Sequence, residues 1–422
     1  MEELIIQNPW WESKTISEEK AKPYKRKIFE KIKNTFFNYK QILILMGLRR
    51  VGKTTLIYQI IEELLKKGTD PFHILYFSFD KVIKEPIEIF KEYERITKIN
   101  WKKERIYVFF DEIQKLDGWT SKIKLLYDNL PNIKFCLSGS ASLTIEEKSV
   151  KDLVGRCFGI EIKFLTLQEF AELYYGKNID NFELYRSEIE AVFDDYVQRP
   201  FPEIVKWQDK EKINNYLKEF IVEKTLKSDT TEIFKKVNIS LLSSLTEIFI
   251  KDVGGVLNIE NLSKDLHVHK LTLANHIYYL KFGKLIRIIK NYRPSVRAES
   301  RKLAKIYLAH PCFAFAYYSE IEKGKIAENL VTAALDIDKY FREGYKEIDF
   351  LKIDGEILPI EVKTKKLLSK TELKTLLWFL KKYKLKKGVI IYQGEEKREF
   401  FGDKELVFLP LQKLLFNFEL YE

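Results

Sequence analysis

Residues 41–56, QILILMGLRRVGKTTL, constrain the fold more than any other stretch of the chain. A short apolar run at residues 42–46 leads into G-x-x-x-x-G-K-T, the pattern of a phosphate-binding loop between a buried strand and a helix. A chance match in a glycine-containing turn would lack that strand and that helix. The residues expected to bind nucleotide are Gly47, Leu48, Arg49, Arg50, Val51, Gly52, Lys53, Thr54 and Thr55.

The chemistry of a triphosphate explains these residue types. Backbone N–H groups can surround phosphates only where the chain wraps tightly, and Gly47 and Gly52 permit that because they have no Cβ. Lys53 places a catalytic positive charge on the outer phosphates, and the Thr54 hydroxyl is expected to ligate Mg²⁺. The helix expected over residues 55–67 directs its positive N-terminal end toward the same anion. ATP and Mg²⁺ are therefore the expected cofactors.

Two further strands are expected to end at this site. Residues 105–112, RIYVFFDE, form an apolar run ending in two acids, with Asp111 as a metal ligand and Glu112 orienting or activating water. A buried strand ending in a solvated acidic turn is the alternative. Ser138 and Ser140 follow the next strand, either as contacts for the γ-phosphate and lytic water or as an ordinary N-cap.

The order of these elements predicts the architecture. Strand-like segments alternate with helix-like ones at the spacing of a parallel, doubly wound α/β sheet. In such sheets ligands lie at the carboxyl ends of the strands, where all three motifs fall.

The succession of motifs resembles a known family. GLRRVGKTT, FSFD, VFFDEIQ, LSGSAS, LVGR, FLTLQEF and RPFPEIV resemble the prokaryotic AAA-plus-like ATPases often called archaeal ATPases, relatives of the STAND NTPases. The resemblance implies that Arg156 is a catalytic arginine finger or phosphate sensor. A structural salt bridge or a DNA-phosphate contact is its alternative. One departure is visible, since similar proteins often have Gly-Gly-Phe-Pro-Glu where this chain has RPFPE at residues 199–203.

The composition of the chain indicates its cellular compartment and the kind of partner it binds. The 422 residues carry a net charge of +11, which favours a polyanionic partner such as DNA or reflects the lysine-rich composition of a hot-environment organism. Three cysteines without metal-ligand spacing indicate a reducing, intracellular compartment. No apolar stretch approaches the roughly 20 residues that span a bilayer. We expect a cytoplasmic protein with no membrane partner.

Four parts are expected along the chain. They are a P-loop ATPase core (1–165), a helical lid over the nucleotide (166–238), a winged helix (239–310) and a nuclease-like domain (311–422). Helix, turn, helix and strand over residues 257–289 outline the winged helix, which the resemblance also implies. Its recognition helix would present Lys270, Thr272, Asn275 and His276. A helical adaptor that packs against protein is the alternative.

The C-terminal region contains a second group of charged residues. Glu328 on a helix, Asp349 on a strand, and Glu361 with Lys363 on the next strand resemble the PD-(D/E)XK pattern of Holliday-junction resolvases and restriction-type nucleases. Carboxylates are hard ligands for Mg²⁺ or Mn²⁺, and Lys363 would be a catalytic residue orienting the nucleophile.

The register of one hairpin tests this second site. A two-residue turn at Asp354–Gly355 would point Asp349 away from Glu361, whereas a three-residue loop over 354–356 would place both on one face. The main hypothesis is an Mg²⁺-dependent ATPase that binds and cleaves DNA, assembling as a homo-oligomer if Arg156 completes a neighbour's site. The alternative is a nucleotide-switched regulatory or scaffolding protein with an inert tail.

Overall fold

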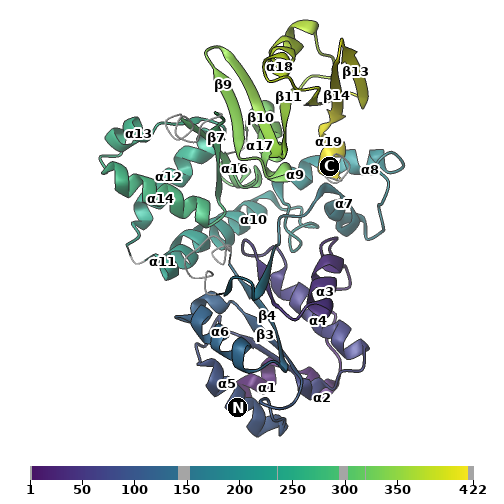
Figure 1. Cartoon of the computed structure of the whole chain (residues 1–422), viewed down its shortest axis with the longest axis vertical. Helices are drawn as coiled ribbons and strands as arrows, with labels where there is room; N and C mark the ends of the chain where they lie inside the picture. Colours follow the sequence, from purple (N-terminus) through teal and green to yellow (C-terminus); the bar gives the residue numbers. More distant parts are fainter. Residues whose placement is uncertain (1, 141–152, 235, 294–302, 319, 417–422) are drawn as a thin grey trace. The chain divides into compact units, whose positions relative to one another are not determined.

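The computed structural model describes residues 2–140, 153–234, 236–293, 303–318 and 320–416 (Figure 1). The chain divides into two compact units, Met1–Lys163 and Phe164–Glu422. The four-part division expected from the sequence remains a prediction. Across the described ranges, every helix is too short or too polar to span a membrane.

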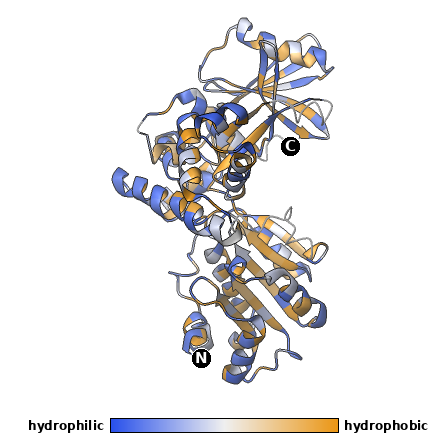
Figure 2. Ribbon diagram, turned by 90° about the vertical axis from the view of Figure 1, so that its left-hand side faces the viewer, coloured by the Kyte–Doolittle hydropathy of each residue, from blue (hydrophilic) through white to orange (hydrophobic). Residues whose placement is uncertain are grey.

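Unit 1 contains a five-stranded sheet in which all neighbouring strands are parallel, as the sequence predicted. The strand order is β2-β3-β4-β1-β5. Buried, mainly apolar residues fill these strands apart from the edge strand β5, and Figure 2 colours much of the sheet as hydrophobic. The strands are β1 (Ile42–Met46), β2 (Ile74–Ser78), β3 (Ile106–Asp111), β4 (Ile133–Gly139) and β5 (Cys157–Glu161).

Helix α4 of unit 1 (Lys53–Lys66) begins and ends within two residues of the helix that was expected over residues 55–67. Helix α4 follows the phosphate loop directly and buries an apolar face at Leu56, Ile60 and Leu64, spaced for one side of a helix. The α-helices are α1 (Glu2–Gln7), α2 (Trp10–Ser13), α3 (Phe29–Asn38), α4 (Lys53–Lys66), α5 (Pro86–Thr97) and α6 (Trp119–Asn129), with 3₁₀ turns at Pro71–His73 and Ile113–Lys115.

The N-terminal segment covers the edge of strand β2. The buried Asn8 side chain donates to the Tyr76 carbonyl oxygen at 2.8 Å and accepts from the Tyr76 N–H at 2.7 Å. The indole N–H groups of Trp10 and Trp11 both donate to the carbonyl oxygen of Ile74. Side chains thus satisfy backbone groups that an edge strand would otherwise offer to another chain.

Unit 2 begins with a run of short helices. Thr166 and Glu169 form a capping box at the start of the first one, which explains why it begins there. Two consecutive π-helical segments follow α10, a conformation that rarely persists beyond one turn. The elements are α7 (Leu167–Tyr175), α8 (Arg186–Ala191), α9 (Phe193–Gln198), α10 (Lys210–Asn215), η5 (Tyr216–Glu223), η6 (Thr225–Asp229) and α11 (Thr230–Ile233).

The next elements follow the order expected of a winged helix. Strands β6 and β7 both pair antiparallel with β8. The elements are α12 (Ile239–Lys251), β6 (Val256–Leu257), α13 (Ile259–Asp265), α14 (Lys270–Phe282), β7 (Ile286–Asn291), β8 (Ala304–Leu308) and α16 (Cys312–Phe315).

The C-terminal elements continue the same sheet, because β7 pairs parallel with β9. The nine strands lie in the order β13-β14-β12-β11-β10-β9-β7-β8-β6. The elements are α17 (Lys323–Leu335), β9 (Lys339–Glu343), β10 (Lys346–Asp354), β11 (Glu356–Val362), α18 (Lys370–Lys382), β12 (Lys387–Tyr392), β13 (Lys397–Phe401), β14 (Lys404–Pro410) and α19 (Leu411–Phe416). One hydrophobic core joins α7–α9 to α17 and α19, with Phe170, Val197, Leu330 and Leu415 among its members.

A buried histidine lies in unit 2 after strand β8. His310 Nδ1 accepts from the Cys312 N–H at 3.2 Å, and its ring lies beside those of Phe164 and Tyr196. Its Nε2 is buried without a hydrogen-bond partner. Burial, aided by the positive charge of Arg287, lowers the pKa of His310 to about 3. His310 is therefore a neutral core residue.

Candidate functional site

The phosphate loop has the backbone that its glycines were expected to allow. Gly52 has φ 100° and lies at the start of α4. A Cβ on Gly47 would lie 2.4 Å from the carbonyl oxygen of Ile162, so a side chain does not fit there. Leu48 and Val51 are buried beneath the loop, whereas Arg50 is exposed. One side of the loop is therefore packed against the protein interior, and the side that carries Arg50 is exposed.

Polar side chains of the phosphate loop and of the acidic end of strand β3 meet at the carboxyl ends of the parallel strands. The Thr54 hydroxyl donates to Asp111 Oδ2 at 2.7 Å. Lys53 Nζ donates to the carbonyl oxygens of Gly47 and Leu48, at 3.0 and 3.1 Å. Thr54 and Asp111, which are expected to share a metal ion, are thus in direct contact. The Lys53 ammonium group lies inside the phosphate loop.

Asp111 is the most enclosed of these residues. It also accepts a hydrogen bond from the Ser138 hydroxyl and one from the Tyr76 hydroxyl at 3.0 Å. Burial, followed by the charge of Glu112, raises the pKa of Asp111, and the hydroxyls of Ser138 and Thr54 oppose the rise. The donor set of one carboxylate and hydroxyls suits a hard divalent cation, whose charge would favour the ionised form of Asp111.

Glu112 is held beside this group. It lies at φ 55°, and the Gln114 side chain donates to its Oε2 at 2.6 Å. The Ser140 N–H in turn donates to Gln114 Oε1 at 3.3 Å. The two serines therefore have different surroundings, since Ser138 contacts the buried acid while the Ser140 backbone reaches Glu112 through Gln114.

Sequence reasoning missed three residues that support this site: Arg26, Tyr76 and Gln114. The buried Arg26 guanidinium donates to the Val51 carbonyl at 3.1 Å and to the Lys163 carbonyl at 2.8 Å. It thereby ties the loop to the end of unit 1. An arginine within the lysine-rich segment at residues 22–31 was the available signal, because its planar guanidinium can serve several carbonyls at once.

The structure does not bring Arg156 to the phosphate loop of its own unit. Arg156 precedes β5, and its carbonyl accepts from the N–H of Ile42, at the amino end of β1. Its guanidinium forms a two-pronged ion pair with Asp128, at 2.7 and 3.2 Å. The phosphate loop and Asp111 lie at the carboxyl ends of the strands, which is the opposite end of the sheet. A finger role would therefore require a second copy of the chain.

The second candidate site has the register that the metal hypothesis needs. Asp354 pairs with Glu356, and Phe350 pairs with Ile360. Continuing this register places Asp349 opposite Glu361, on the same face of the hairpin. Asp349 Oδ2 also accepts from the Val362 N–H at 2.8 Å. The hairpin thus has the odd loop rather than the two-residue turn.

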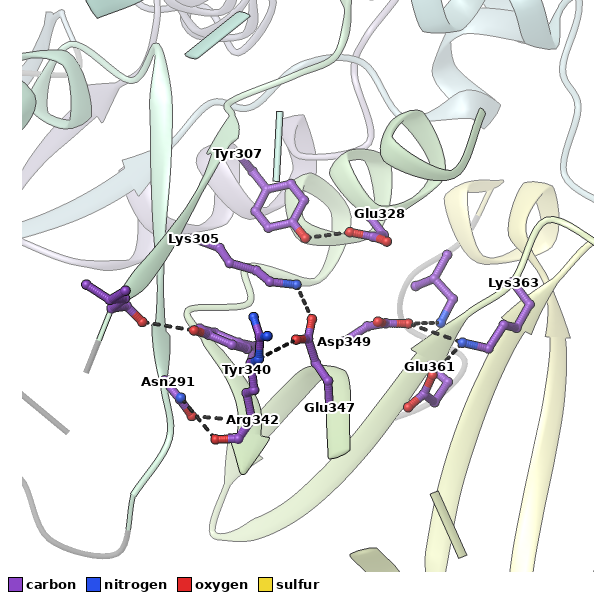
Figure 3. A network of polar contacts seen from close by, with 12 residues as sticks. Asn291, Lys305, Tyr307, Glu328, Tyr340, Arg342, Glu347, Asp349, Glu361 and Lys363 are labelled. Atoms are coloured by element: carbon purple, nitrogen blue, oxygen red, sulfur yellow. Dashed lines mark hydrogen bonds and ion pairs between the residues drawn. The ribbon is translucent and has the colours of Figure 1, made fainter. Parts of the chain in front are cut away.

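Figure 3 shows the polar side chains around this hairpin. Lys363 Nζ lies 2.6 Å from Glu361 Oε2 and 3.8 Å from Asp349 Oδ2. Glu328, from α17, accepts a hydrogen bond from the Tyr307 hydroxyl at 2.6 Å. Glu361 is buried, and its Oε1 has no hydrogen-bond partner. That orphaned oxygen is unusual, because buried carboxylate oxygens normally have donors.

The electrostatics of this group reflect crowded negative charge. Burial and the charge of Asp349 raise the pKa of Glu361 to about 8, against the opposing effect of Lys363. Burial and Asp349 also raise the pKa of Glu328. Within the described ranges, no three His, Cys, Asp or Glu side chains are arranged to hold a metal ion together. Asp349 and Glu361 face each other across the hairpin, and the charge of Asp349 also raises the pKa of Glu328.

The helix expected to read DNA presents fewer polar residues than predicted. Lys270 and Asn275 are exposed on α14 and Thr272 is partly exposed, but His276 is buried. His276 Nε2 accepts from the Asn238 N–H at 2.9 Å, which leaves Nδ1 to donate to the Thr272 carbonyl. The prediction of His276 as a surface contact was wrong, because the residue joins α14 to the start of α12.

The motifs of unit 1 agree with a match to a known family model. Residues 39–171 match the model described as "AAA domain". The match, the parallel sheet and the loop together support an AAA-like P-loop ATPase. Residues 193–318 and 323–414 match two domains of unknown function, DUF8612 and DUF4143.

Two relatives that cover most of the chain are described as uncharacterised proteins. MJ1637 of Methanocaldococcus jannaschii is 28% identical over 416 residues, covering 88% of this chain and 84% of that protein. MJ1544 of the same organism is 26% identical over 336 residues, covering 75% and 73%. The solved Pif1 helicase from Candida albicans is 16% identical with a TM-score of 0.26, covering 39% of this chain and 47% of the helicase.

Proposed function

We propose that the protein is an Mg²⁺-dependent ATPase that acts on DNA. The observation that carries the ATPase part is the contact of Thr54 with Asp111 beside Lys53. These are the residue types that phosphoryl transfer requires, a lysine for phosphate charge and a hydroxyl–carboxylate pair for the metal. Bound Mg²⁺ would neutralise charge on the phosphates.

Each residue then has a distinct part in hydrolysis. Lys53 would leave the loop carbonyls and contact the outer phosphates. Glu112, held by Gln114, would orient the water that attacks the γ-phosphorus. The bond between that phosphorus and the bridging oxygen breaks, giving ADP and inorganic phosphate. Ser138 keeps Asp111 oriented throughout.

DNA is the partner that charge and element order favour. The net charge of +11 and the winged-helix order of α12 to β8 support a polyanionic ligand. The slope of log affinity against log salt concentration tests this part. Several phosphate contacts predict a steep slope, whereas a flat slope would favour the scaffolding alternative.

We also propose a metal-dependent phosphodiesterase site in unit 2. Its support is the shared face of Asp349 and Glu361 with the orphaned Glu361 Oε1. Mg²⁺ commonly binds proteins through one or two carboxylates and keeps several waters, so two acids suffice. Lys363 would orient the attacking water. Cleavage of plasmid and branched DNA by wild type and Lys363→Ala tests it, and an uncut substrate in both would end this part.

The experiment that joins the two sites is ATP turnover with and without DNA. Wild type is expected to release phosphate faster when DNA is added. Glu112→Gln should bind ATP but lose turnover and its stimulation. Turnover of wild type that is unaffected by any DNA would favour the switch, and an equal rate in Glu112→Gln would exclude the proposed role of Glu112.

A further inference from the structure

A tyrosine on strand β2 contacts the acid that is expected to hold the metal ion of the nucleotide site. Tyr76 pairs with Phe109 in the parallel ladder of β2 and β3, and side chains alternate along a strand. The Tyr76 side chain therefore lies on the same face of the sheet as that of Asp111, the second residue after Phe109. The Tyr76 hydroxyl reaches across that face and donates to Asp111 Oδ2 at 3.0 Å.

Hydroxyl groups occupy most of the Asp111 carboxylate. Thr54 and Tyr76 both donate to Oδ2, and Ser138 donates to Oδ1. An ionised carboxylate has about four acceptor positions, two on each oxygen. Among the residues that the structure describes, the donors therefore fill Oδ2 and leave one position on Oδ1. That position is available to a cation or to one of the waters that Mg²⁺ keeps in protein sites.

The surroundings of Tyr76 hold its side chain in place. The residue is 3% exposed. Its ring lies 5.1 Å from that of Tyr58 on α4, the helix that follows the phosphate loop, and 6.4 Å from that of Trp10 on α2. The Asn8 side chain binds both the N–H and the carbonyl of Tyr76. The N-terminal segment and α4 thus fix the position from which the hydroxyl donates.

We infer that Tyr76 is a positioning residue of the nucleotide site, which turns Asp111 Oδ1 toward the metal ion by occupying Oδ2. This inference rests on the proposed Mg²⁺-dependent binding of ATP. Groups that hydrogen-bond a metal-binding carboxylate fix its orientation, and their loss typically weakens metal binding about 10–100-fold. Thr54 is itself an expected metal ligand, so Tyr76→Phe is the change that alters Oδ2 without removing a ligand.

The test measures how much Mg²⁺ strengthens nucleotide binding by the full chain. Calorimetric titration with the non-hydrolysable ATP analogue AMP-PNP, in Mg²⁺ and in EDTA, gives two dissociation constants whose ratio is the contribution of the metal ion. Tyr76→Phe should lower this ratio about 10–100-fold, or to one if the wild-type ratio is smaller, and should bind AMP-PNP in EDTA as wild type does. A general loss of structure would instead weaken binding in both solutions and leave the ratio unchanged.

Tyr93→Phe is the matched control. Tyr93 is also a buried tyrosine of unit 1, but its hydroxyl donates to the Phe72 carbonyl, before the amino end of β2. Removing that hydroxyl should leave the ratio at the wild-type value.

ATP turnover gives a second measurement. In Tyr76→Phe the Mg²⁺ concentration for half-maximal turnover should rise about 10–100-fold, and saturating Mg²⁺ should restore turnover. A wild-type ratio in Tyr76→Phe, or turnover that is reduced equally at every Mg²⁺ concentration, would overturn the inference and leave Mg²⁺-dependent nucleotide binding in place. Equal binding of AMP-PNP by wild type in Mg²⁺ and in EDTA would overturn the proposed Mg²⁺ dependence itself. Should Tyr76→Phe fail to fold, Tyr76→Met, whose flexible side chain fills irregular gaps and has no donor, replaces it under the same criteria.

Discussion

The buried His310 predicts how the stability of unit 2 responds to acid. In the folded chain its pKa lies near 3, whereas the unfolded value is about 6.5. Below pH 6.5 the unfolded chain therefore binds a proton that the folded chain excludes until about pH 3. The stability that His310 contributes is complete above pH 6.5 and falls as the pH decreases through that window.

The size of this effect follows from the two pKa values. At pH 5 the pKa of the histidine in the unfolded chain lies about 1.5 units above the solution pH. Each unit of that difference corresponds to about 1.4 kcal/mol. Unit 2 should therefore lose about 2 kcal/mol of unfolding free energy from His310 alone between pH 7 and pH 5. The full burial of the side chain means that solvent screening removes little of this figure.

The assay compares wild type with His310→Asn, which keeps an acceptor for the Cys312 N–H and does not titrate. Urea unfolding followed by circular dichroism gives the free energy of unfolding of each at pH 7 and pH 5. Other titrating groups act equally in both proteins. Wild type should lose about 2 kcal/mol more than the variant on acidification. Equal losses in the two proteins would refute the reasoning.

Three further perturbations test other parts of the structure. Gly47→Ala places a methyl group 2.4 Å from a buried carbonyl oxygen, so we expect about 1–3 kcal/mol of destabilisation, measured as a lower melting temperature. Asn8→Ala leaves the N–H and carbonyl of Tyr76 unpaired at the edge of β2, which should cost about 2 kcal/mol in urea unfolding. Arg156→Ala and Asp128→Ala both break one exposed ion pair. Only Arg156→Ala should lower ATP turnover if the arginine completes a neighbour's site, and equal turnover in both would exclude that role.

Much of unit 1 could be predicted because its signals are local. A glycine-bounded loop must follow a strand and begin a helix, and apolar runs ending in acids must end at the same edge of a parallel sheet. Strand β5 escaped prediction because only Ile160 of its residues is buried and because it contains a glycine. Edge strands of that kind carry little hydrophobic pattern.

The residues that were missed depend on contacts between distant segments. Arg26 donates hydrogen bonds to residues that are 25 and 137 positions away in the sequence, Val51 and Lys163. Hydrophobic periodicity along the sequence does not indicate hydrogen bonds at such separations. The burial of His276 and the approach of Tyr307 to Glu328 have the same origin. In contrast, the sequence left only two possible registers for the hairpin that carries Asp349 and Glu361. Because side chains alternate along a strand, the register decides whether the two acids share a face.

The measurement that tests the account most directly is calorimetric titration of the folded protein with ATP and Mg²⁺. Wild type should bind one nucleotide per chain, and Lys53→Ala should bind at least about tenfold more weakly because a buried charge opposite the phosphates is lost. Circular dichroism of both proteins establishes that they are folded. A folded wild type that binds no nucleotide, or a Lys53→Ala variant that binds equally well, would contradict the account.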